Sequence, residues 1–136
     1  MKNFLLLIIL ILSCSKLLAH ATIIIEGVEH NEGYIDVKIY INNENFLKEE
    51  MAIESVRKKA VKGQNIIPLS KIHEGPFAIA VYHDENGDGK LNTGLFWRPK
   101  EGYAFSNNYT PKGPPSFKKA KILITHGEPI TIRLNY

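Results

Sequence analysis

Short segments in which apolar and polar residues alternate constrain the fold of this chain most strongly. In residues 34–41, Ile or Val occupies every second position from Ile35 onward, and the intervening positions include Asp36 and Lys38. A period of two residues places the apolar side chains on one face of an extended segment, which predicts a half-buried β-strand. No segment has the periodicity of a long helix, and no internal repeat is present. The fold therefore has to be built from strands.

The other predicted strands are short and are separated by turn residues. Pro68 cannot donate to a central hydrogen-bond ladder, so residues 65–69 predict an edge strand. Residues 76–83 carry no charge on either face, which predicts a central strand that is covered on both sides. Residues 46–59 fit a helical turn or a strand, and a loop leading into a strand is favoured. We expect an all-β domain, a single antiparallel β-sandwich of about seven strands, immunoglobulin-like or transthyretin-like, with a long ordered loop. The remaining predicted strands are 22–26, 119–124 and 129–136.

The N-terminus has the pattern of a secretory signal peptide. Lys2 precedes an apolar run that ends at Leu12, and this run is shorter than the roughly 20 residues that a transmembrane helix needs. Residues 19–21 read Ala-His-Ala, so we expect cleavage after Ala21 and a mature domain over residues 22–136 without a transmembrane segment. The alternative is a lipobox at residues 11–14, with a lipid anchor on Cys14. Both interpretations predict an exported protein, periplasmic or secreted.

Cleavage after Ala21 would remove the one cysteine, so the mature chain could form no disulfide and no thiolate site. It would also remove Lys2 and Lys16 from the 17 Lys and Arg residues, which leaves 15 basic side chains against 14 acidic ones. A charge so close to balance gives no general attraction to nucleic acid, and we expect no nucleic-acid partner.

Residues 83–94 resemble a calcium-binding loop in the spacing of their oxygen-bearing side chains. Counted from Asp84, acid or amide residues stand at the first, third, fifth and ninth positions, and a glycine stands at the sixth. A tight loop points alternate side chains at one centre, and Ca²⁺ binds several oxygens at ~2.3–2.6 Å. Leu95 stands where an EF-hand has a bidentate Glu, and Glu101 is a candidate to fold back in its place. The predicted ligands are Asp84, Asn86, Asp88, the carbonyl of Lys90, and Asn92.

The alternative explanation of this loop needs no ion. Asp and Asn side chains accept hydrogen bonds from backbone N–H groups in tight turns, and the same residue types serve that purpose. Both explanations stay open from the sequence.

Residues 84–116 form a long excursion that is rich in aromatic side chains. A loop of this length in a compact domain is usually functional or held by its own contacts. Exposed aromatic rings could bind a glycan, a peptide or an envelope protein. The rings could instead pack the loop onto the sandwich. The candidate ligand-binding residues are Phe96, Trp97, Arg98, Tyr103, Phe105 and Asn107.

An enzyme is the less favoured interpretation. His83, Glu101 and Ser106 would have to converge in one pocket to make a hydrolytic site. The sequence has no nucleophile elbow, HExxH motif or Gly-rich phosphate loop. The other histidines have no zinc-ligand spacing. They are His20, His30, His73 and His126.

Three stretches resemble the bacterial family called domain of unknown function 2141. They are residues 74–91 (EGPFAIAVYHDENGDGKL), 99–108 (PKEGYAFSNN) and 114–120 (PPSFKKA). The resemblance implies a small exported protein, β-sandwich-like, with no settled activity. This chain has Asn92 where such loops often carry Asp, which makes the anionic character of the loop weaker.

Overall fold

The computed structural model describes residues 20–136, except for the side chain of Trp97. The predicted lipobox at Cys14 and most of the predicted signal peptide, residues 1–21, lie outside this range. Signal cleavage and lipid attachment therefore stay predictions. Within residues 20–136, no helix combines the length and the apolar character that crossing a bilayer requires.

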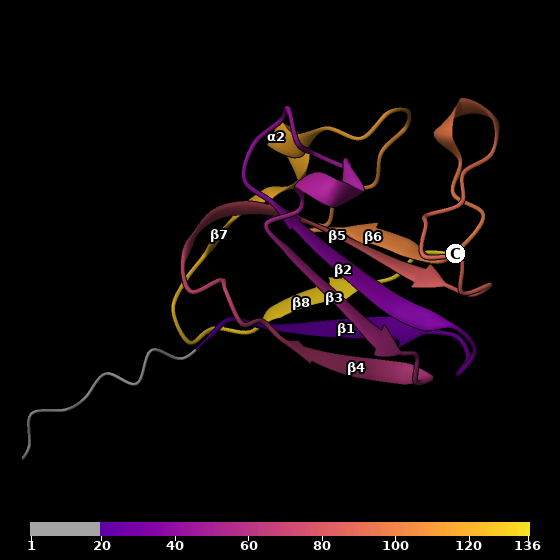
Figure 1. Cartoon of the computed structure of the whole chain (residues 1–136), viewed down its shortest axis with the longest axis horizontal. Helices are drawn as coiled ribbons and strands as arrows, with labels where there is room; N and C mark the ends of the chain where they lie inside the picture. Colours follow the sequence, from indigo (N-terminus) through magenta and orange to yellow (C-terminus); the bar gives the residue numbers. More distant parts are fainter. Residues whose placement is uncertain (1–19) are drawn as a thin grey trace, which may run out of the picture.

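Eight strands form two sheets that pack as a sandwich (Figure 1). The smaller sheet has the order β4-β1-β8, and the larger has the order β3-β2-β5-β6, with β7 also paired to β5. Between residues 20 and 136, helical structure is limited to the short segments η1 (Glu49–Met51), η2 (Leu95–Trp97) and α2 (Phe117–Ala120). The strands are β1 (Thr22–Val28), β2 (Tyr34–Tyr40), β3 (Glu54–Lys59), β4 (Gly63–Pro68), β5 (Gly75–Asp84), β6 (Tyr103–Phe105), β7 (Lys121–Ile124) and β8 (Ile130–Arg133).

The main hydrophobic core lies between the two sheets. Alternate residues of each strand point into it, as the period of two predicts. These side chains are almost completely shielded from solvent, so the predicted β-sandwich is confirmed. The core members from the central strands are Ile23 and Ile25 of β1, Ile35, Val37 and Ile39 of β2, and Ile79 and Val81 of β5.

Two details differ from a purely antiparallel sandwich of seven strands. The described residues form eight strands, and β8 runs parallel to β1, with Ile23 opposite Ile130. The parallel pair arises because the chain leaves β7 in the larger sheet and crosses to the smaller one before it forms β8. The ambiguous segment 46–59 forms a loop, the short η1 and then β3. Pro68 lies at the end of β4, at the edge of the smaller sheet, as predicted.

Strand β5 is central in the larger sheet. It pairs with β2 along one edge, and with β7 and then β6 along the other. Its outer face, which carries Ala78 and Ala80, is covered by a second apolar cluster that includes Tyr40, Phe105 and Ala120. Rings from segments far apart in the sequence complete this cover. Both faces of β5 are therefore buried, as its uncharged sequence predicts.

Candidate functional site

Strand β5 ends at Asp84, which anchors the loop that follows. Asp84 is fully buried. Its Oδ1 accepts hydrogen bonds from the N–H groups of Gly87 (2.9 Å) and Asp88 (3.1 Å), and its Oδ2 accepts one from Gly89 (2.8 Å). Arg57 of β3 adds a fourth bond, from Nη2 to Oδ2 at 2.6 Å. These four donors match the four acceptor positions of a carboxylate, so the protein itself satisfies Asp84.

Arg57 joins Asp84 to a second carboxylate on the outer face of the larger sheet. Its Nη1 donates to Oδ2 of Asp36 at 2.6 Å. Burial raises the pKa of Asp36, and the nearby guanidinium of Arg57 partly offsets that rise. The hydrogen bond to Asp84, followed by the attraction of Asp36, outweighs desolvation and raises the pKa of Arg57. One cation thus neutralises two buried acids.

The remaining predicted ligands lie together on the exposed side of the loop. The N–H of Asp88 donates to Oδ1 of Asn86 (3.0 Å), and the N–H of Lys90 donates to Oδ1 of Asp88 (2.9 Å). The Nδ2 of Asn92 donates to Oδ2 of Asp88 at 3.0 Å. That bond, and then the Lys90 N–H, lower the pKa of Asp88. The loop has the bonding of turn chemistry, and a Ca²⁺ ion at this loop stays a prediction.

Glu101 folds back onto the loop and ties it to the chain that returns. Its Oε2 accepts hydrogen bonds from the backbone N–H (3.1 Å) and Nδ2 (3.3 Å) of Asn92. Its Oε1 accepts a bond from the N–H of Glu85 at 3.2 Å. Glu101 is 8% exposed, so these bonds form in a largely desolvated place. Glu101 therefore fastens both ends of the segment 85–92.

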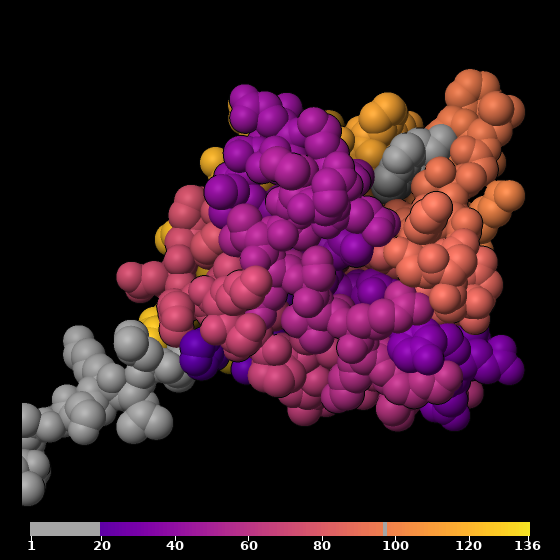
Figure 2. Space-filling model, viewed as in Figure 1, coloured from indigo at the N-terminus to yellow at the C-terminus, as the bar shows by residue number. Residues whose placement is uncertain are grey.

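Residues 92–100 form a hairpin that projects from the sandwich (Figures 1 and 2). Its two arms are joined by bonds from the N–H of Gly94 to the Arg98 carbonyl (2.6 Å) and from the N–H of Lys100 to the Asn92 carbonyl (2.9 Å). At its tip, Leu95 and Phe96 are 78% and 82% exposed. The tip is therefore an apolar surface held away from the body of the protein.

The predicted ligand-binding residues divide into two groups. Phe96 and Arg98 are exposed on the hairpin, and Tyr103 lies half-buried near its base. Phe105 is 3% exposed and belongs to the second apolar cluster, so its ring packs the loop onto the sandwich. The Nδ2 of Asn107 donates to the Lys119 carbonyl at 2.9 Å. Phe105 and Asn107 are thus part of the packing of the loop, and Phe105 is not available as a surface.

The three candidate catalytic residues bond to different partners. The Ser106 hydroxyl accepts from the N–H of Ile79 (2.8 Å) and donates to the Ala120 carbonyl (2.5 Å). Ile79 and His83 are four residues apart on β5, a separation of about 13 Å along a strand. Among the described residues, no hydrogen bond joins any two of His83, Glu101 and Ser106. The geometry gives them no shared pocket.

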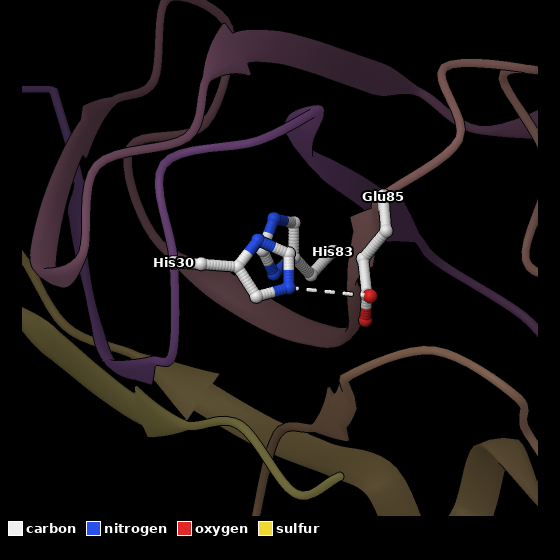
Figure 3. Close-up of side chains that lie close together, drawn as sticks. All are labelled: His30, His83 and Glu85. Carbon is white, nitrogen blue, oxygen red and sulfur yellow. Dashed lines mark hydrogen bonds and ion pairs between the residues drawn. The ribbon is translucent and has the colours of Figure 1, made fainter.

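A cluster that the sequence did not reveal lies at the end of β5. His30, His83 and Glu85 place ligand atoms within 4.8 Å of one another (Figure 3). His30 belongs to the turn between β1 and β2, and its Nε2 lies 3.2 Å from Oε2 of Glu85. In the sequence, only the strong strand patterns of residues 34–41 and 76–83 pointed to this cluster. Their antiparallel pairing places Ile35 opposite His83, which brings the turn before β2 close to the end of β5.

The fold and the site define a small all-β domain with an acidic loop, a projecting apolar hairpin and a histidine–glutamate cluster. A family model described as an uncharacterized protein conserved in bacteria (DUF2141) matches residues 23–132. The chain belongs to this family, as the resemblance predicted. No curated protein and no solved structure matches it.

Proposed function

We propose that this protein is an exported binding module of the bacterial cell envelope, which holds an acidic glycan beside the 92–100 hairpin. The N-terminal signal pattern supports export. The observation that carries the binding role is a groove between the hairpin and the turn at residues 111–113. The groove has a volume of about 370 Å³, which is at the lower end of the ~300–1,000 Å³ range of small-ligand sites.

The walls of this groove combine aromatic and cationic side chains. Phe96 and Arg98 come from the hairpin, Tyr103 from β6 and Lys112 from the facing turn. Aromatic faces pack well against the C–H groups of a sugar ring, and Arg and Lys bind carboxylates through charge-assisted hydrogen bonds. A sugar that carries a carboxylate, such as a uronic acid, uses both kinds of contact at once.

A peptide fits this groove less well. Extended peptides commonly bind by adding a strand to a free sheet edge, where backbone groups supply the affinity. The groove is lined by side chains of the hairpin, of a turn and of Tyr103, and the backbone of Tyr103 already bonds to Asn135. Its chemistry therefore favours a glycan.

We further propose that a Ca²⁺ ion stiffens the base of the hairpin. The spacing of the loop residues supports this role, and so does the arrangement around Asn92, whose Nδ2 lies 3.0 Å from Asp88 Oδ2 and 3.3 Å from Glu101 Oε2. Rotation of the Asn92 amide would turn an oxygen toward the same point. Extracellular calcium modules bind with a Kd of ~10⁻⁴–10⁻³ M, and we expect that range here.

Calorimetric titration of the purified protein with uronic-acid oligosaccharides tests the binding role. We expect saturable binding that Phe96→Ala and Arg98→Ala each weaken, by about 10-fold for Arg98→Ala because a hydrogen bond to a charged group is lost. Leu95→Ala is the matched control, since Leu95 is as exposed as Phe96 but does not line the groove. Equal affinity for a neutral oligosaccharide of the same length, or equal binding by all three variants, would contradict the proposal.

Calcium titration needs variants that leave the loop folded. Asp84→Ala would release three backbone N–H groups and Arg57, so its effect would not distinguish ion binding from loop anchoring. Asp88→Asn and Asn92→Ala alter exposed or partly exposed side chains instead. Loss of calcium binding in both variants supports a Ca²⁺ site in this loop, provided that both variants melt at the temperature of the parent protein in the presence of chelator. Absence of binding at millimolar calcium in the parent protein would refute it.

A further inference from the structure

We propose that His30, His83 and Glu85 form a binding site for a divalent transition metal such as Zn²⁺, separate from the acidic loop and from the glycan groove. The two imidazole rings lie next to each other with their planes tilted by 39°, and the carboxylate of Glu85 stands beside His30 (Figure 3). The inference does not depend on the proposed function.

The donor set matches the preferences of zinc. Two imidazole nitrogens and one carboxylate are common ligands of Zn²⁺, whereas Ca²⁺ prefers oxygen alone. Two ligands on a tetrahedral ion with bonds of ~2.0–2.1 Å lie about 3.3 Å apart. The distance from His30 Nε2 to Glu85 Oε2 is 3.2 Å, so this pair already has the spacing of two metal ligands.

His83 presents a lone pair in a fixed direction. Its Nε2 lies 2.6 Å from the Glu32 carbonyl oxygen, which can only accept, so Nε2 carries the hydrogen. Its Nδ1 is then the acceptor and lies 2.7 Å from the Tyr136 hydroxyl. A ligand histidine typically donates its other N–H to a backbone carbonyl in this way. Metal binding therefore requires the Tyr136 ring to turn aside and release Nδ1. Tyr136 is 49% exposed, and this movement would also break the 3.2 Å bond that its hydroxyl accepts from the Glu29 N–H.

The His30 ring is free to adjust. Its Nδ1 is buried and has no hydrogen-bond partner among the described residues, so the contact with Glu85 and the stacking on His83 are what hold it. The two ring centroids are 4.5 Å apart. The ligand atoms now lie within 4.8 Å of one another. To reach the spacing of about 3.3 Å around a tetrahedral ion, they must move closer by about 1–1.5 Å. A half-exposed side chain on a turn can make that shift.

The backbone around the cluster is rigid. Gly33, in the turn that carries His30, has φ +69° and packs directly on the end of β5, where a Cβ at that position would lie 2.1 Å from the Asp84 carbonyl oxygen. Glu85 is held from the other side, since its Oε1 accepts a bond from the N–H of Gly102 at 3.4 Å. The three ligands therefore sit on a preformed frame and only side chains need to move.

Titration of the purified protein, without a histidine tag, with Co²⁺ and then Zn²⁺ tests the site. We expect one equivalent of Co²⁺ to bind with the visible absorption of a tetrahedral ion, and Zn²⁺ to displace it. His30→Ala and Glu85→Gln should each weaken binding by more than about 10-fold, because loss even of a group that only orients a ligand costs at least that much. Thermal melts without metal verify that both variants are folded.

His73→Ala is the matched control. The His73 ring lies against that of His20 at the same centroid distance of 4.5 Å, and its Nδ1 is also buried. Among residues 20–136, this Nδ1 has no hydrogen-bond partner and no carboxylate bonds to either ring. We expect His73→Ala and Asp88→Asn to bind zinc as the parent protein does. No saturable binding of either metal, binding by His30→Ala and Glu85→Gln with the affinity of the parent protein, or loss of binding in His73→Ala alone would overturn the assignment.

Discussion

Replacing Arg57 by Met should destabilise the protein strongly, because it leaves two buried carboxylates without their shared cation. Asp84 is fully buried, Asp36 is 6% exposed, and both bond to Arg57 at 2.6 Å. Removal of one partner from a buried ion pair costs ~3–5 kcal/mol. The Arg57 side chain is 34% exposed and Asp84 keeps three backbone donors, so we reduce the expected loss to about 2–3 kcal/mol near neutral pH.

The loss should depend on pH in a definite direction. Burial already raises the pKa of Asp36, and Arg57 opposes that rise. Without Arg57 the folded-state pKa of Asp36 goes higher still, while the unfolded value stays near 3.9. A carboxyl group with a raised folded pKa contributes stability at low pH that is lost as pH rises through that pKa. The difference in free energy of unfolding between the parent protein and Arg57→Met should therefore become smaller as pH falls from about 7 to about 5.

Urea unfolding at both pH values measures this effect. Lys59→Met is the matched control, since Lys59 lies on the same strand and also lies over the Tyr34 ring, but no carboxylate of the described part of the chain is bonded to it. A loss of 2–3 kcal/mol corresponds to a melting shift of roughly 8–12 °C in a domain of this size. If Arg57→Met and Lys59→Met lie within about 0.5 kcal/mol of each other at both pH values, the argument from buried charge is wrong.

Two further predictions concern the backbone and the buried phenols. Gly33→Ala should lower the free energy of unfolding by about 3 kcal/mol or more, because the backbone there is left-handed and an added Cβ would also clash with backbone atoms. Gly63→Ala should lower it by only about 1–2 kcal/mol, because Gly63 has φ +94° but no atom within 4 Å of an added Cβ. Equal losses of the two variants in urea unfolding would refute the argument from the clash. Burial raises the pKa values of Tyr40 and Tyr82 above 10, so the contribution of these phenols to the free energy of unfolding should be constant below about pH 10 and fall as pH rises further. Tyr82→Phe should reduce the loss of stability above about pH 10. If urea unfolding shows the same loss in Tyr82→Phe as in the parent protein, the prediction is wrong.

Local patterns in the sequence predicted the parts of the structure that local physics decides. Alternation identified β2, and the absence of charge on β5 predicted that both of its faces are covered, because burial acts on each strand directly. The loop after Asp84 brings together the side chains that its spacing indicated, since each contact there spans only a few residues.

The rest depends on which strands become neighbours, and periodicity does not encode that. The parallel pairing of β1 with β8 has no local signature. Arg57 is separated from Asp84 by β4 and most of β5, so the loop alone could not reveal its cation. Phe96 and Phe105 are the same residue type in one excursion, and only the pairing of β6 with β5 decides that the second is buried.

The position of β1 in the smaller sheet has a kinetic consequence. It is the middle strand, and one of its two partners is β8, the last strand that the structure describes. Contacts between such distant segments pay a large chain-closure entropy and slow the folding of a domain. The three-stranded layer cannot be completed until residues 130–133 are available. Until then, one edge of the apolar strand β1 stays open to pairing with another chain. The yield of refolded protein should therefore be higher at low protein concentration than at high concentration.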